Sequence, residues 1–335
     1  MSRFALRLWT AVVYISAALV AASPVRAEVI LGPSQFGASG TPYFRFGSFP
    51  DDPTQTQNNP SFYLSNLDFS GVGWRLPGIF STAAYSVTMI DDIHFLGAWH
   101  VHVGNFMNVG DTINFRPAGS TNTLLQRTVA NVQNVPNPDG STSDVLLGTL
   151  NVAFAPGSGI AAYPITPAAV TQQEMYIYGR QSEVGRNNVS GTQAGINFPI
   201  DGNPAHNETL NAVLYDYDQP GATGLTSPDG LPSTVGNDEA YLNGGDSGGP
   251  SFVLTGGQLQ IIGTHAAVTD YAGVGLTKPA GAQDDVSFSL DSNLPAYSAT
   301  IAAMVPEPST TALSLFAAGG ALASYVRSRR RAKSA

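Results

Sequence analysis

The chain has 335 residues, of which 43% are hydrophobic and only 12% are charged, and it contains no cysteine, which excludes disulfides and thiolate metal sites. Between Glu28 and Val305 there are 7 basic and 23 acidic residues, so this part carries a net charge of −16. So acidic a surface argues against nucleic acid or an anionic membrane as a partner.

The first 27 residues have the features of a signal peptide. Arg3 and Arg7 precede an apolar stretch over residues 8–22, and Val25-Arg26-Ala27 has the small-x-small pattern of a signal peptidase site. We therefore expect an exported protein whose mature chain begins near Glu28.

Short apolar runs separated by Gly, Pro, Asn and Ser predict an all-β protein, because few stretches show the period of a helix. Residues 294–305 form the one segment predicted to be a helix. Residues 50–60 and 187–239 are rich in polar and turn-forming residues and predict loops, and two prolines indicate a change of domain over residues 163–169. The predicted strands cover residues 86–90, 112–115, 145–154, 175–178, 212–215, 251–254 and 259–262.

Residues 85–103 contain three histidines that could act as a base, namely His94, His100 and His102. All three are separated by even numbers of residues, so on an extended chain they would point to one face, and spacing alone does not choose among them. Further along, Asp144 stands at the head of an apolar strand. It is a candidate for an orienting carboxylate, or else an aspartate that starts a strand after a turn.

The segment Gly244-Gly245-Asp246-Ser247-Gly248-Gly249-Pro250 is the most informative motif. Its four glycines let the backbone turn sharply, so that the hydroxyl of Ser247 projects beside bare main-chain N–H groups. This geometry suits an acyl-transfer nucleophile, although a surface turn has the same composition. A serine also needs a base and an orienting acid to become reactive.

Chain order separates the possible hydrolase classes. The elbow of α/β-hydrolases requires an acid and then a histidine after the serine, but here His265 is the only later histidine and Asp270 follows it. An acid-histidine-serine order would require alternating helices and strands, which this chain lacks. The remaining order is histidine, aspartate, serine.

With these residues, the chain resembles the chymotrypsin-like serine peptidases over roughly residues 70–305. The serine motif carries the resemblance most strongly. Gly97-Ala98-Trp99-His100 is similar to the family's Thr-Ala-Ala-His stretch except at Trp99, and Ser143-Asp144-Val145-Leu146-Leu147 is similar to its Asp-Ile-Ala-Leu-Leu pattern. The resemblance implies that Ser247 attacks, His100 moves the proton and Asp144 orients His100, while the N–H groups of Gly245 and Ser247 form an oxyanion hole.

The resemblance also implies a fold and a substrate pocket. The fold would be two antiparallel six-stranded β-barrels packed face to face with a short C-terminal helix, the first barrel within residues 28–165 and the second within 166–305. Asp246 would hold the serine loop in shape. The pocket residues would be Tyr241 at the base, which does not support a preference for Lys or Arg, and Thr264, His265 and Ala266 at the wall, where the histidine would favour an acidic or polar substrate side chain. We expect no metal and no cofactor.

The C-terminal 30 residues resemble a PEP-CTERM sorting signal. Pro306-Glu307-Pro308 precedes an apolar segment over residues 309–326, and five basic residues follow it. A helix of this length would reach ~27 Å, enough to cross the bilayer core with the basic cluster on the cytoplasmic side. The resemblance implies recognition by an exosortase-type processing enzyme after transient membrane insertion; the alternative is a plain membrane anchor.

Taken together, the sequence predicts a serine endopeptidase exported to the cell envelope or beyond, which hydrolyses a protein or peptide substrate through an acyl-enzyme and does not bind nucleic acid. The alternative is a non-catalytic surface or matrix-associated binding protein that keeps the peptidase fold.

Overall fold

A computed structural model divides the chain into two units, Met1–Ser298 and Ala299–Ala335. The residues that it describes are 29–30, 42–47, 58–75, 85–120, 123–169, 171–179, 182–199, 207–215, 235, 239–242, 245–269 and 288–305. The predicted signal peptide and the predicted apolar helix over residues 309–326 lie outside these ranges, as do Gly244 and residues 50–57.

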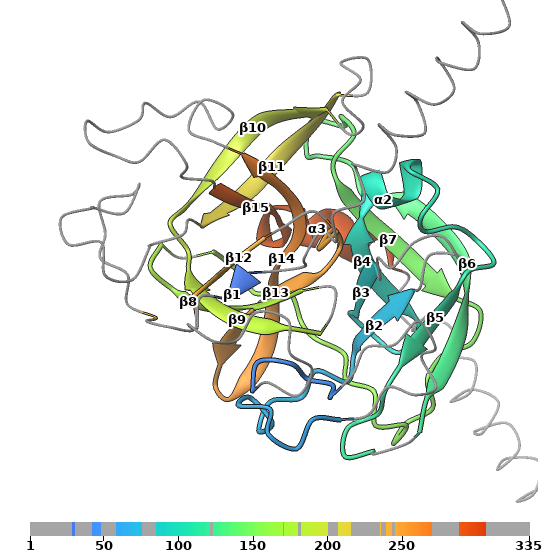
Figure 1. The fold of residues 1–335 in the computed structure, drawn as a ribbon. Coiled ribbons are helices and arrows are strands. Elements are labelled where there is room, and N and C mark those ends of the chain that lie inside the picture. Colours follow the sequence, from blue (N-terminus) through green and yellow to red (C-terminus); the bar gives the residue numbers. More distant parts are fainter. Residues whose placement is uncertain are drawn as a thin grey trace, which may run out of the picture. The chain divides into compact units, whose positions relative to one another are not determined.

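Six antiparallel strands form a closed barrel in the order β2-β3-β4-β7-β6-β5 (Figure 1). This confirms the prediction of a mainly β fold and of a closed first barrel with six strands. Figure 1 shows the barrel in blue to green, with the short helix α2 (Trp99–Val103) directly after β4. The strands are β2 (Val72–Arg75), β3 (Tyr85–Met89), β4 (His94–Ala98), β5 (Thr112–Phe115), β6 (Leu125–Asn134) and β7 (Val145–Leu150).

The barrel interior is filled by aromatic rings that face glycines on neighbouring strands. Phe95 is fully buried, and a Cβ atom at Gly148 of β7 would lie 2.0 Å from its ring. Phe115 occupies the space beside Gly73 in the same way, at 2.5 Å from a Cβ there. Because β4 and β7 pair from His94↔Thr149 to Ala98↔Val145, the C-terminal end of β4 and the N-terminal end of β7 meet at the same end of the barrel.

The second sheet has seven strands in the order β10-β11-β15-β14-β13-β8-β9, and it is not closed by pairing between its edge strands. The prediction of a second closed barrel with six strands is therefore not confirmed. The two edges follow each other in the chain, separated only by Val189 and Ser190, so the sheet curls back on itself. The strands are β8 (Glu174–Tyr178), β9 (Val184–Asn188), β10 (Gly191–Pro199), β11 (Asn207–Tyr215), β13 (Pro250–Thr255), β14 (Gln258–Thr269) and β15 (Phe288–Asn293).

Three further elements test the sequence predictions. Helix α3 (Leu294–Met304) confirms the predicted C-terminal helix. The hairpin of β10 and β11 occupies part of residues 187–239, where the sequence predicts a loop-rich insert; Gly and Asn in β10 and Asn in β11 are turn-forming types, and neither strand alternates polar and apolar residues regularly along its whole length. A two-residue strand, β1 (Val29–Ile30), pairs with β12 (Ala240–Tyr241).

Asn137 ties the barrel to the second sheet. Its side-chain amide donates to the Thr209 carbonyl of β11 at 2.8 Å, while its Oδ1 accepts from the Tyr297 hydroxyl at 2.7 Å. The predicted domain change at residues 163–169 lies between β7 and β8, and the division into two successive domains stays a prediction.

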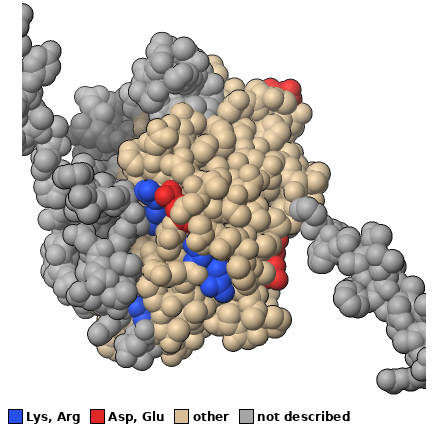
Figure 2. Space-filling view, turned by 90° about the vertical axis from the view of Figure 1, so that its right-hand side faces the viewer, with Lys and Arg blue, Asp and Glu red and all other residues tan. Residues whose placement is uncertain are grey.

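Charged side chains contribute little to the described surface. Figure 2 shows one face that is largely free of Lys, Arg, Asp and Glu, in keeping with the 12% charged content of the chain. Arg75 and Asp111 form one of the few ion pairs among the described residues, at 2.9 Å. With so few ion pairs among the described residues, the fold depends mainly on apolar burial and on hydrogen bonds.

Candidate active site

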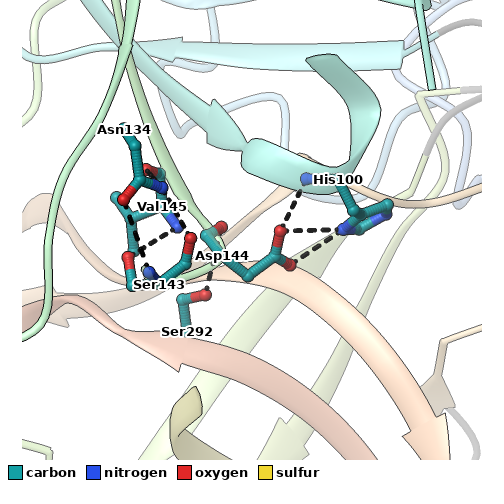
Figure 3. Close-up of polar contacts among 6 residues, drawn as sticks. All are labelled: His100, Asn134, Ser143, Asp144, Val145 and Ser292. Carbon is teal, nitrogen blue, oxygen red and sulfur yellow. Dashed lines mark hydrogen bonds and ion pairs between the residues drawn. The ribbon is translucent and has the colours of Figure 1, made fainter. Parts of the chain in front are cut away.

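His100 and Asp144 meet at the end of the barrel where β4 ends and β7 begins (Figure 3). Nδ1 of His100 lies 2.9 Å from Oδ1 and 2.8 Å from Oδ2 of Asp144. A carboxylate accepts hydrogen bonds, so Nδ1 carries the hydrogen and Nε2 keeps its lone pair. This is the tautomer that a general base requires.

Asp144 also explains why the chain turns into a helix at Trp99. The first N–H groups of a helix have no acceptor within the helix. Here the N–H of Trp99 donates to the Asp144 carbonyl at 3.2 Å, and the N–H of His100 donates to its carboxylate at 2.8 Å. The expectation that the three histidines share one strand face is therefore wrong, because His100 and His102 lie on α2 and His94 lies on β4.

The two competing histidines have other partners. Nδ1 of His94 lies 2.7 Å from Oδ2 of Asp91 in the β3–β4 turn. His102 places Nδ1 2.7 Å from the carbonyl of Met107 and packs its ring against Trp99. The pairing with Asp144 thus distinguishes His100 from both.

The environment of His100 changes its affinity for protons. Burial lowers the pKa of His100, but the negative charge of Asp144 and the hydrogen bond to it outweigh this effect, so the pKa is raised above 6.5. Asp144 itself is fully buried. On its other side, the hydroxyl of Ser292 from β15 lies 3.5 Å from the Asp144 carbonyl (Figure 3).

Ser247 lies in a tight turn between β12 and β13. Gly245 and Gly248 have φ angles of +101° and +82°, which side chains with a Cβ rarely adopt. The carbonyl of Asp246 accepts from the N–H of Gly249 at 2.9 Å and closes the turn. Among the described residues, nothing accepts a hydrogen bond from the N–H of Gly245 or Ser247.

Contacts of Gly248 hold this turn against the barrel. A Cβ atom at Gly248 would lie 2.8 Å from the carbonyl oxygen of Ser86 in β3 and 3.2 Å from the amide nitrogen of Ala98. Ala98 is the last residue of β4 and directly precedes the helix that carries His100. The turn with Ser247 therefore packs beside the start of that helix.

The sequence-predicted pocket residues lie in different places. Tyr241 is half-buried in β12 and pairs with Val29, and it is not among the described residues that line the cavity beside Ser247. Thr264, His265 and Ala266 lie in β14, all buried, and the last two line that cavity. The cavity has a volume of about 180 Å³ and is lined by Leu242, Asp246, Ser247, His265, Ala266, Ala267 and Val268.

His265 points into the second sheet. Its Nδ1 lies 2.8 Å from Oδ1 of Asp291, and its Nε2 lies 3.1 Å from the carbonyl of Tyr178. Both His265 and Asp291 are fully buried, and Tyr215 donates its hydroxyl to the same Oδ1 at 3.1 Å. Sequence reasoning missed Asp291, Tyr215 and Ser292, since no local pattern marks them and only the pairing of β14, β15 and β11 brings them to the site.

The described part of the chain shows no group of three or more His, Cys, Asp and Glu side chains that could hold a metal ion. Within the same ranges, neither α2 nor α3 is long and apolar enough to span a membrane. The predicted span at residues 309–326 lies beyond them.

Comparison with known protein families matches residues 305–331 to the PEP-CTERM protein-sorting motif. The chain carries a PEP-CTERM sorting signal. Exosortase-type enzymes recognise this signal, and it directs the protein to the cell envelope or the extracellular space. No curated protein matches the sequence.

Proposed function

We propose that the chain is an exported serine endopeptidase of the chymotrypsin-like type, which works at the cell envelope or outside the cell. The observation that carries the proposal is the pairing of Nδ1 of His100 with the buried carboxylate of Asp144, next to the turn that presents Ser247. A histidine–aspartate pair and a glycine-rich turn that presents a serine each also occur in proteins without catalytic activity. Nucleophilic catalysis by serine requires both of them together.

The proposed fold is the two-barrel arrangement of that family. If β9 and β10 are counted as one bent strand, the second sheet has six strands. The first half of this bent strand, β9, pairs with β8, and its second half, β10, pairs with β11. The joint at Val189 and Ser190 would then be the bend that closes the second barrel. This interpretation supports a site at the junction of the two barrels.

In the proposed reaction, the hydroxyl of Ser247 attacks the carbonyl carbon of the scissile bond, and Nε2 of His100 takes its proton. The N–H groups of Gly245 and Ser247 stabilise the oxyanion, where the loss of one such donor costs about 2.7 to 4 kcal/mol in other enzymes. His100 then gives its proton to the leaving amine, and an acyl-enzyme on Ser247 remains. A water molecule, deprotonated by His100, hydrolyses it.

The proposed course of export includes transient insertion of the apolar C-terminal segment into the membrane. An exosortase-type enzyme would then remove this segment. The folded part would act after this release.

A fluorophosphonate probe on the exported protein tests the proposal. We expect labelling of the wild type and none of Ser247→Ala, while Ser65→Ala, which changes an exposed serine, should be labelled normally. Peptide turnover should fall by about 10⁶ in Ser247→Ala, by analogy with subtilisin. If the folded wild type is not labelled, the proposal is wrong, and a non-catalytic binding protein becomes the better explanation.

A further inference from the structure

The cavity beside Ser247 is the feature from which a substrate preference can be inferred. Its volume of about 180 Å³ is below the 300–1,000 Å³ of pockets for whole small molecules, so it suits a single side chain. Ser247 is one of its walls, and no residue of the first barrel is among the described residues that line it.

The position of the cavity shows which part of a substrate would enter it. The leaving amine receives its proton from His100, so the leaving group lies on the side of Ser247 that faces α2 and the barrel. The described lining of the cavity comes from Leu242, the serine turn and β14 of the second sheet, and His100 is not part of it. The acyl part of the substrate therefore extends toward the cavity.

His265 does not offer a ring nitrogen to this cavity. Both nitrogens are used, one by Asp291 at 2.8 Å and the other by the carbonyl of Tyr178 at 3.1 Å. A ring atom, Cδ2, would lie 2.6 Å from a Cβ at Gly249, which places the ring under the serine turn. This arrangement removes the reason for expecting an acidic or polar substrate side chain.

The other described residues that line the cavity are mainly apolar and short. Leu242, Ala266, Ala267 and Val268 contribute hydrocarbon surface, and the two alanines leave room that larger residues would fill. Asp246 also lines the cavity but is only 1% exposed, so most of the described lining surface is uncharged. A charged substrate side chain that entered would lose water without gaining a partner from these walls.

We propose that this cavity receives the substrate side chain on the acyl side of the scissile bond, and that it selects an uncharged, apolar side chain of small to medium size, from alanine to leucine or methionine. The proposal rests on the proposed peptidase function. In this proposal His265 contributes ring carbon to the cavity wall and lies against the serine turn at Gly249, while both of its nitrogens are held by Asp291 and Tyr178.

The direct test uses the exported protein and a series of peptide anilides that differ only in the residue before the anilide. We expect kcat/KM for leucine or methionine to exceed that for alanine by about 10- to 200-fold, as found for added methylene groups in hydrophobic pockets. Glutamate and lysine should be hydrolysed at least about 100-fold more slowly than methionine, which has a similar length. Fastest hydrolysis of the glutamate or lysine substrate would overturn the proposal.

A pair of variants at Val268, which is 41% exposed at the edge of the cavity, tests its location. Val268→Lys should raise the ratio of kcat/KM for glutamate over methionine by at least about tenfold relative to Val268→Met, which has a similar length and no charge. An unchanged ratio in both variants would show that the side chain binds elsewhere.

The fluorophosphonate probe separates this proposal from the underlying function. A protein that is labelled at Ser247 but prefers charged residues remains a peptidase and contradicts only the inferred preference. A folded protein that is neither labelled nor active on any substrate overturns both.

Discussion

Replacement of Asp144 by asparagine tests the central contact of the site. The carboxylate accepts from the N–H of His100 at 2.8 Å and from its Nδ1 at 2.9 and 2.8 Å. An amide has the same size but only one accepting oxygen, and the N–H of His100 competes for it. When the amide nitrogen faces Nδ1, the imidazole must carry its hydrogen on Nε2, where it cannot accept the proton of Ser247.

The expected loss in kcat is about 10⁴-fold, the size of effect known for this change in a serine peptidase triad. At 1.36 kcal/mol for each factor of ten, this corresponds to about 5.4 kcal/mol of lost transition-state stabilisation. The free energy of unfolding should fall much less, since the amide still caps α2 through its oxygen.

The pH dependence gives a second, independent measure. Burial lowers the pKa of His100, while the charge of Asp144 and the hydrogen bond to it raise the pKa by more. Because His100 must be unprotonated to act as a base, wild-type kcat/KM should rise with pH through this raised pKa. Asp144→Asn removes the two effects that raise the pKa of His100 and keeps the burial that lowers it, so the pH midpoint of the variant's residual activity should move to lower pH.

The same raised pKa affects the free energy of unfolding. The stability that protonated His100 contributes is fully present below pH 6.5 and is lost as the pH rises through the raised pKa.

The assay is steady-state hydrolysis of a methionine or leucine anilide from pH 5 to 9, with thermal unfolding of each protein. Asp139→Asn is the matched control, since it changes an exposed carboxylate in the loop before β7 that bonds only to Ser141 among the described residues. Its activity and midpoint should equal those of the wild type. An Asp144→Asn variant with more than about a tenth of wild-type kcat, or with an unmoved midpoint, would refute the role assigned to the pair.

Two further predictions concern the residues that hold the serine turn. Gly248→Ala should slow fluorophosphonate labelling at least about tenfold and lower Tm, because its φ of +82° disfavours a Cβ and the methyl group would lie 2.8 Å from the Ser86 carbonyl. Gly257→Ala, at a φ of +83° with open space around it, should lower Tm through backbone strain alone and leave the labelling rate unchanged; equal rates in the two variants would contradict the packing argument. His265→Leu should lower the free energy of unfolding by about 3–5 kcal/mol in urea titrations, because it leaves the buried carboxylate of Asp291 without its histidine. Asp291→Asn should cost less because the hydrogen bond with Tyr215 can persist, and a larger loss than for His265→Leu would contradict this ranking.

Several features could be predicted from the sequence because they depend on residues that are close in the chain. The period of short apolar runs predicts β structure, and glycines around Ser247 predict a turn with positive φ angles, as found at Gly245 and Gly248. The order of histidine, aspartate and serine along the chain is enough to exclude two hydrolase classes. The PEP-CTERM signal is also a local pattern, and it is confirmed at residues 305–331.

Other features depend on contacts between distant residues, and only the tertiary structure decides them. Spacing does not choose among the three histidines and only a family resemblance favours His100, whereas the pairing of β4 with β7 brings His100, and neither of the others, to a carboxylate 44 residues away. Asp144 also accepts from the first N–H groups of α2, from Trp99 at its main-chain carbonyl and from His100 at its carboxylate, where the sequence spacing would also fit a strand. His265 lines the cavity without offering it a ring nitrogen, because Asp291 on the neighbouring strand and the carbonyl of Tyr178 hold both nitrogens. Residue patterns record which side of a strand is apolar, but the partners of a strand are set by long-range packing, and these partners determine which polar groups meet.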